Sequence, residues 1–145
     1  MTQYTCKYCL LLLLIVGISA CSSTVKTPQM QVGAQRSELY LPILQGKRVG
    51  LVVNQTSRVG DKHLLDYLLA LNINVVRVFA PEHGFRGDHD AGAHVSNDID
   101  SLTSIAITSI YGKNKKPTAE IMADLDVIIF DIQDVGVRFY TFISS

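Results

Sequence analysis

A short loop between two apolar segments brings an acid, a base and two glycines together, in the order Pro81-Glu82-His83-Gly84-Phe85-Arg86-Gly87. Glu82 follows an apolar run closely, so folding is expected to remove part of the water around its carboxyl group. Loss of water favours the protonated form of a carboxyl group, and nearby Asp88 or Asp90 would act in the same direction. A protonated glutamic acid can act as a general acid. The structural alternative is that Glu82 accepts hydrogen bonds from the amides of its own loop.

Two further polar segments follow apolar runs in the same way. Asn54-Gln55-Thr56 comes after the first run, and a segment from Asp131 to Tyr140 begins at the end of the last one. If these runs are parallel strands, their carboxyl ends meet at one edge of a sheet, which is where such sheets bind ligands. The predicted ligand contacts are Asn54, Gln55, Thr56, His83, Arg86, Asp131, Gln133, Asp134, Arg138 and Tyr140.

Structural roles stay open for these same residues. Asn54 could close the turn after its strand, and an Asp–Arg pair could hold the last loop. A metal site is a further alternative, because His83, His89 and His94 share one loop with Asp88 and Asp90, and imidazole and carboxylate suit zinc. The histidine spacing does not match an established pattern such as H-E-x-x-H. The sequence therefore predicts no metal and no other cofactor, with a metal-dependent hydrolase as a rival interpretation.

The elements that must position these residues follow from the apolar patterning. Short apolar runs predict strands buried on both faces at 48–54, 75–80, 105–110 and 126–131. Helical spacing of leucines predicts a helix over 61–71, and a second helix is expected over 117–123. Alternating strands and helices indicate an α/β fold, a Rossmann-like parallel sheet with flanking helices. The first strand is not followed by G-x-G-x-x-G, so a dinucleotide site is not indicated.

Charge excludes one class of partner. The chain has 13 basic and 13 acidic residues, for a formal net charge of zero. Nucleic-acid binding needs a basic face, so no nucleic-acid partner is expected.

The amino-terminal residues have the pattern of a bacterial lipoprotein signal. Lys7 precedes an apolar run from Leu10 to Val16, and Ile18-Ser19-Ala20-Cys21 resembles a lipobox. The run is shorter than the roughly 20 apolar residues that span a bilayer. We expect a signal peptide over residues 1–20, cleavage before Cys21, and acylation of that cysteine. Cleavage removes the other two cysteines, so no disulfide is expected.

This signal predicts an exported protein, anchored by lipid on the periplasmic or cell-surface side of a bacterial membrane. Ser22 after Cys21, in place of Asp, favours the outer membrane in enteric-type bacteria. Residues 21–45 are mostly polar and are interpreted as a tether. Residues 46–145 are interpreted as an incomplete Rossmann-like catalytic domain, because the sequence stops at what looks like the opening of another helix.

Several motifs, in order and spacing over about residues 46–145, resemble the bacterial exo-β-N-acetylmuramidases, long known as a domain of unknown function. The motifs are G-L-V-V-N-Q-T at Gly50–Thr56, F-A-P-E-H-G-F-R-G at Phe79–Gly87, S-I-Y-G-K at Ser109–Lys113, K-P-T at Lys116–Thr118 and F-D-I-Q-D-V-G-V-R-F-Y-T at Phe130–Thr141. Long motifs in a shared order are far more specific than one short motif.

The resemblance implies a glycoside hydrolase that releases the terminal non-reducing N-acetylmuramic acid from peptidoglycan fragments. It maps the catalytic glutamate, a general acid/base, to Glu82. It also implies a second domain with the active site in the cleft between the two, so a chain truncated before that domain could be inactive. Arg86 or Arg138 is expected to face the lactyl carboxylate of muramic acid. The binding alternative is a lipoprotein that holds cell-wall sugars without cutting them.

Overall fold

The computed structural model describes residues 30–87, 97–113, 115–138 and 142. The chain divides into two compact units, Met1–Met30 and Gln31–Ser145. Of the first unit only Met30 is described, so the predicted signal peptide and Cys21 lie outside the described residues. The description below concerns the second unit. Within the described residues, none of the helices has the length and hydrophobicity needed to cross a bilayer.

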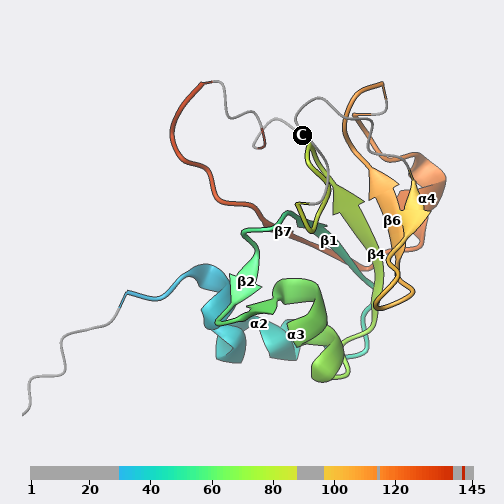
Figure 1. Cartoon of the computed structure of the whole chain (residues 1–145). Coiled ribbons are helices and arrows are strands. Elements are labelled where there is room, and N and C mark those ends of the chain that lie inside the picture. Colours follow the sequence, from blue (N-terminus) through green and yellow to red (C-terminus); the bar gives the residue numbers. More distant parts are fainter. Residues whose placement is uncertain (1–29, 88–96, 114, 139–141, 143–145) are drawn as a thin grey trace, which may run out of the picture. The chain divides into compact units, whose positions relative to one another are not determined.

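A five-stranded sheet forms the centre of this unit, in the order β5-β6-β4-β1-β7 (Figure 1). β1 (Val49–Val53) lies between β4 (Val75–Ala80) and β7 (Val127–Asp131), and β6 (Ala106–Ser109) pairs with β4. These four strands are parallel, and each falls within one of the four predicted strand segments. β5 (Asp98–Ile99) runs antiparallel to β6 and was not predicted. The α/β prediction is confirmed.

Burial explains why β1 is an interior strand, between β4 and β7. Val49, Leu51 and Val53 are fully buried and point to one face of the sheet. Gly50 points to the other face, where an added Cβ would lie 2.8 Å from the Leu125 Cδ1 and 3.1 Å from the Phe79 Cε2. The missing side chain at this position lets the segment after α4 pack directly on the sheet.

Helices lie on both faces. On one face, α2 (Ser37–Leu44) and α3 (Leu64–Ala70) contribute to the main core, with Leu44, Leu64, Leu65 and Leu68 almost completely buried. On the other face, Met122 of α4 (Ala119–Ala123) lines a groove of about 390 Å³ over Val52, Phe79 and Ile128. Figure 1 shows α2 and α3 lying together and apart from α4.

The helix predicted over 61–71 begins at Leu64 instead. Residues 58–63 form a small antiparallel hairpin, β2 (Arg58–Val59) and β3 (Lys62–His63). Gly60 has φ 58° at the turn between them, a conformation that glycine adopts without a steric cost. Three residues of the predicted helix are therefore turn and strand.

The tether predicted over residues 21–45 differs from the structure in its later part. Residues Gly33–Gln35 form a 3-10 helix, η1, which is followed by α2. The Tyr40 hydroxyl donates to the Ala34 carbonyl at 2.7 Å, and Ala34 and Leu44 join the core. α2 is short and contains Pro42, so its sequence pattern does not predict a helix. The helix became evident only from its packing in the structure.

Candidate functional site

Four polar segments meet at the carboxyl ends of the parallel strands. They begin at Asn54 after β1, Pro81 after β4, Ile110 after β6 and Asp131 at the end of β7. The loops after β1 and β4 also touch each other, because a Cβ at Gly87 would lie 2.9 Å from the Gln55 Cβ. We call this edge, made by residues 54–57, 81–87, 110–111 and 131–134, the strand-end rim.

A tight turn holds the loop that carries Glu82. The Gly84 amide donates to the Pro81 carbonyl at 3.1 Å, and His83 and Gly84 both have left-handed backbone, with φ 71° and 72°. Left-handed backbone is uncommon at a residue other than glycine, so His83 indicates that its surroundings dictate the loop conformation. Glu82 is one of the residues of this turn, and its side chain is half-buried.

Tyr111 provides a partner for Glu82 from the segment that follows the neighbouring strand β6. Its hydroxyl donates to the Glu82 Oε1 at 3.0 Å. This hydrogen bond to Glu82, with a smaller contribution from burial, raises the pKa of the Tyr111 phenol. The sequence did not predict this contact between Tyr111 and Glu82.

Asn54 closes the turn after β1, which is the structural alternative that the sequence left open. It is buried, and its Oδ1 accepts from the Thr56 amide at 2.9 Å and from the Thr56 hydroxyl at 2.7 Å. Its backbone carbonyl accepts from the His63 Nε2 at 3.0 Å. Gln55 and Thr56 are exposed on the rim.

Asp131 places a carboxyl group partly inside the protein. Its Oδ2 is buried and has no hydrogen-bond partner among the described residues. Burial raises the pKa of this carboxyl group, and the nearby His63 opposes the shift. Asp131 lines a pocket of about 230 Å³ together with Thr56 and Gln133. Three of the predicted contacts therefore share one pocket.

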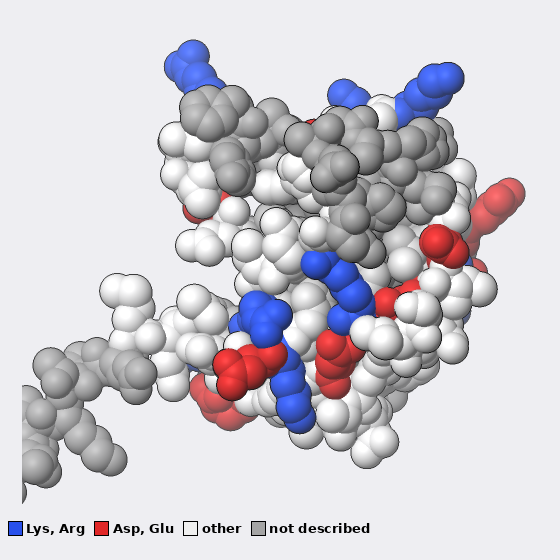
Figure 2. Space-filling model, viewed as in Figure 1, with Lys and Arg blue, Asp and Glu red and all other residues white. Residues whose placement is uncertain are grey.

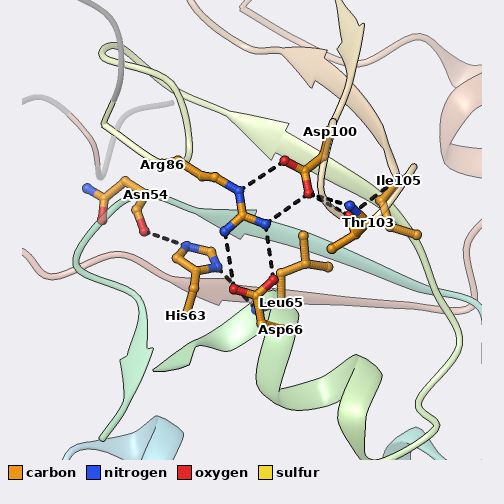
Figure 3. Close-up of polar contacts among 8 residues, drawn as sticks. All are labelled: Asn54, His63, Leu65, Asp66, Arg86, Asp100, Thr103 and Ile105. Atoms are coloured by element: carbon orange, nitrogen blue, oxygen red, sulfur yellow. Dashed lines mark hydrogen bonds and ion pairs between the residues drawn. The ribbon is translucent and has the colours of Figure 1, made fainter. Parts of the chain in front are cut away.

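The remaining predicted contacts differ in their surroundings. Arg86 is engaged by two carboxylates, Asp66 and Asp100 (Figure 3). Asp134 accepts from the Gly136 amide at 2.9 Å and so closes its own turn. Arg138 is exposed, and Tyr140 lies outside the described residues.

The part of the chain that the structure describes holds no group of three His, Cys, Asp or Glu residues able to bind a metal ion. Asp88, His89, Asp90 and His94, which the metal interpretation needs, lie outside it. On the face drawn in Figure 2, acidic and basic side chains intermingle over the described surface. Charge on this face therefore does not favour a polyanionic partner.

Comparison with known proteins gives concordant matches. The family model described as exo-beta-N-acetylmuramidase NamZ, N-terminal, matches residues 49–145. The peptidoglycan beta-N-acetylmuramidase NamZ of Bacillus subtilis (strain 168) is 42% identical over 127 residues, which are 86% of this chain and 31% of the relative.

Two solved structures of DUF1343 family proteins from Bacteroides fragilis NCTC 9343 are also similar. One is 48% identical with a TM-score of 0.63, over 77% of this chain and 28% of that protein. The other is 43% identical with a TM-score of 0.63, over 74% and 27%. The chain thus spans about a third or less of the length of each of these proteins.

Proposed function

The chain belongs to the NamZ exo-β-N-acetylmuramidase family, and on that premise we propose that the protein hydrolyses peptidoglycan fragments and releases their terminal non-reducing N-acetylmuramic acid. The observation that carries the proposal is Glu82, which projects from a tight turn at the strand-end rim and receives a hydrogen bond from Tyr111. A half-buried glutamate with a fixed direction is suited to proton transfer in glycoside hydrolysis.

In the proposed reaction, Glu82 donates its proton to the glycosidic oxygen as the bond to the anomeric carbon breaks. The anomeric carbon becomes oxocarbenium-like, and water completes the substitution after losing a proton to a base. Tyr111 fixes the direction of the Glu82 carboxyl group through the 3.0 Å hydrogen bond. No cofactor is needed for this sequence of steps.

Asp131 is the described carboxyl group that best suits the role of partner. It lines a pocket, and its Oδ2 lacks a hydrogen-bond partner within the described residues. Asp134, the other candidate, already accepts the Gly136 amide. β4 and β7 flank β1, so a strand spacing of about 4.8 Å separates their ends by roughly 10 Å. The separation of the two carboxyl groups themselves distinguishes inverting enzymes, at roughly 6.5–9.5 Å, from retaining ones, at roughly 5 Å. The acetamido group of the substrate is the alternative partner.

Substitution of Glu82 in the full-length protein tests the assignment. With a chromogenic aryl β-N-acetylmuraminide, Glu82→Gln should lower kcat/KM by about 10²–10⁴-fold, the usual contribution of general acid–base catalysis. Glu120→Gln, on the exposed side of α4, should stay near wild type. The decrease in kcat/KM should be smaller for a substrate with a dinitrophenyl leaving group, because this group departs with less need for protonation by a general acid. Near-wild-type turnover of Glu82→Gln would remove Glu82 from the mechanism, and wild-type binding of the sugar without turnover would favour the binding alternative.

We also propose that acylation of Cys21 anchors the protein outside the cytoplasmic membrane, where peptidoglycan fragments arise. The supporting features are Lys7, the apolar run from Leu10 to Val16 and the residues before Cys21. Each buried methylene of an attached chain contributes about 0.8 kcal/mol to membrane binding, so several chains together give a stable anchor.

A further inference from the structure

Arg86 makes four hydrogen bonds to two carboxylates (Figure 3). Its Nε and one terminal nitrogen donate to Asp100 at 2.9 Å each. Its two terminal nitrogens donate to Asp66 at 3.2 and 3.0 Å. A guanidinium group has five N–H donors in a planar fork, so this arrangement occupies most of them.

Both carboxylates are held by neighbouring parts of the fold. Asp66 lies in the first turn of α3. Asp100 is 5% exposed and also accepts from the Thr103 amide at 3.1 Å and the Thr103 hydroxyl at 2.6 Å. The Arg86 guanidinium holds the pKa of Asp100 below its usual range. Arg86 therefore ties the loop after β4 to a helix and to the turn between β5 and β6.

Phe85 anchors the same loop at the preceding position. Its ring is 4% exposed and meets the His63 ring edge-on, with 5.4 Å between centroids. The Arg86 Cζ lies 4.8 Å from the Phe85 ring centroid. Glu82 thus lies within a backbone turn at residues 81–84, and the two anchored side chains at 85 and 86 follow it directly.

Charge decides between two roles for Arg86. One guanidinium with two ionised carboxylates has a net charge of +1 − 2 = −1. A substrate carboxylate would be repelled by the net negative charge of this cluster. A bidentate contact between that carboxylate and Arg86 would also require Arg86 to give up its pair with Asp66 or Asp100. We propose that Arg86, held by Asp66 and Asp100, is a positioning residue that sets the place of the Glu82 carboxyl group and makes no contact with the substrate. This inference rests on the proposed function.

The test uses the full-length protein and two conservative variants, Arg86→Lys and Asp66→Asn. Lys keeps the charge but loses the planar fork, and Asp66→Asn removes one charge from a partly exposed side chain. Both should lower kcat at least about tenfold, because small misplacements of a catalytic group are costly. KM should change little, and so should the ratio of affinities for N-acetylmuramic acid and N-acetylglucosamine, which lacks the lactyl group. Arg48→Lys is the matched control, since Arg48 makes a comparable pair with Asp126 at the opposite edge of the sheet.

A double-mutant cycle separates positioning from a general loss of stability. If Arg86 acts through Glu82, then Arg86→Lys should have almost no further effect in a Glu82→Gln background. Full additivity would overturn the inference, as would a tenfold weaker affinity for N-acetylmuramic acid with unchanged affinity for N-acetylglucosamine. If Arg86→Lys does not fold, the same criteria apply to Asp66→Asn. Failure of the proposed function is recognised by a different result, namely full activity of Glu82→Gln. That result would overturn the inference about Arg86 as well.

Discussion

At the scale of single residues, the site depends on which partner each polar side chain finds. Glu82 receives the Tyr111 hydroxyl, whereas Arg86 has its donors committed to Asp66 and Asp100. Two residues of one motif, four positions apart, therefore have different roles in the proposed mechanism. In that proposed mechanism, Glu82 acts on the substrate and Arg86 holds the loop that carries Glu82.

The Tyr111–Glu82 contact has a spectroscopic consequence that is independent of activity. Replacing Glu82 by Gln removes the carboxylate whose hydrogen bond and charge raise the pKa of Tyr111, so this pKa should fall toward its ordinary value of 10.0. The measurement is a ¹³Cζ tyrosine titration by NMR, with Tyr111→Phe used to assign the resonance. Asp134→Asn is the control and should leave the titration in place. An unchanged Tyr111 titration in Glu82→Gln would mean that the contact is absent in solution.

At the scale of elements, the hairpin of β2 and β3 delivers a histidine to the start of α3. The His63 Nδ1 accepts from the Leu65 amide at 3.2 Å, and the Nε2 faces the Asn54 carbonyl at 3.0 Å. This pair of contacts requires the neutral ring, with its proton on Nε2. Burial is the main cause that lowers the pKa of His63. The helix cap and the loop after β1 are thereby linked through one imidazole.

Stability should therefore depend on pH through His63. The folded pKa lies below the unfolded value of 6.5, so the unfolded state binds more protons as pH falls. The stabilisation is present in full above pH 6.5 and is lost as pH decreases toward the lower folded pKa. His63→Asn keeps a capping side chain, worth about 1 kcal/mol, but does not titrate. In thermal melts between pH 8 and 5, the Tm of the wild-type protein should fall as the pH decreases. The Tm of His63→Asn should change less over the same range. If Tm depends on pH equally in the two proteins, the pH dependence does not come from His63.

At the scale of the whole molecule, the proposed anchor and the proposed enzyme have different locations in the chain. The lipobox-like residues end at Cys21, while the family match covers residues 49–145. α2 packs into the core between these regions, so the span available as a tether is shorter than 21–45. The anchor and the hydrolase activity should accordingly be separable by mutation.

Cys21→Ser tests this separation. The variant should lose incorporation of labelled palmitate and move from the membrane fraction to the soluble exported fraction, because its acyl chains are gone. Its kcat/KM on a soluble muramide should stay within about twofold of wild type, since surface changes far from a site are usually small. Retention of label or of membrane association in Cys21→Ser would exclude Cys21 as the anchor.

Much of the fold was predictable from local patterns. Runs of apolar residues such as Val75–Ala80 indicate buried strands, and their alternation with helices indicates a parallel sheet. The position of Glu82 at a strand end follows from the same patterns. α2 and the β2–β3 hairpin were not predicted, because both are short and their stability comes from packing on the rest of the chain.

The sequence by itself determined the fold class, the family and the segments that end at the strand-end rim, since each is encoded by residues close together in the chain. Only the tertiary structure decided the strand order and the partners of the site residues. Glu82 meets Tyr111 across 29 positions, and Arg86 meets Asp66 and Asp100 across 20 and 14. Such contacts depend on how elements pack, and packing is a property of the whole fold that no local pattern contains.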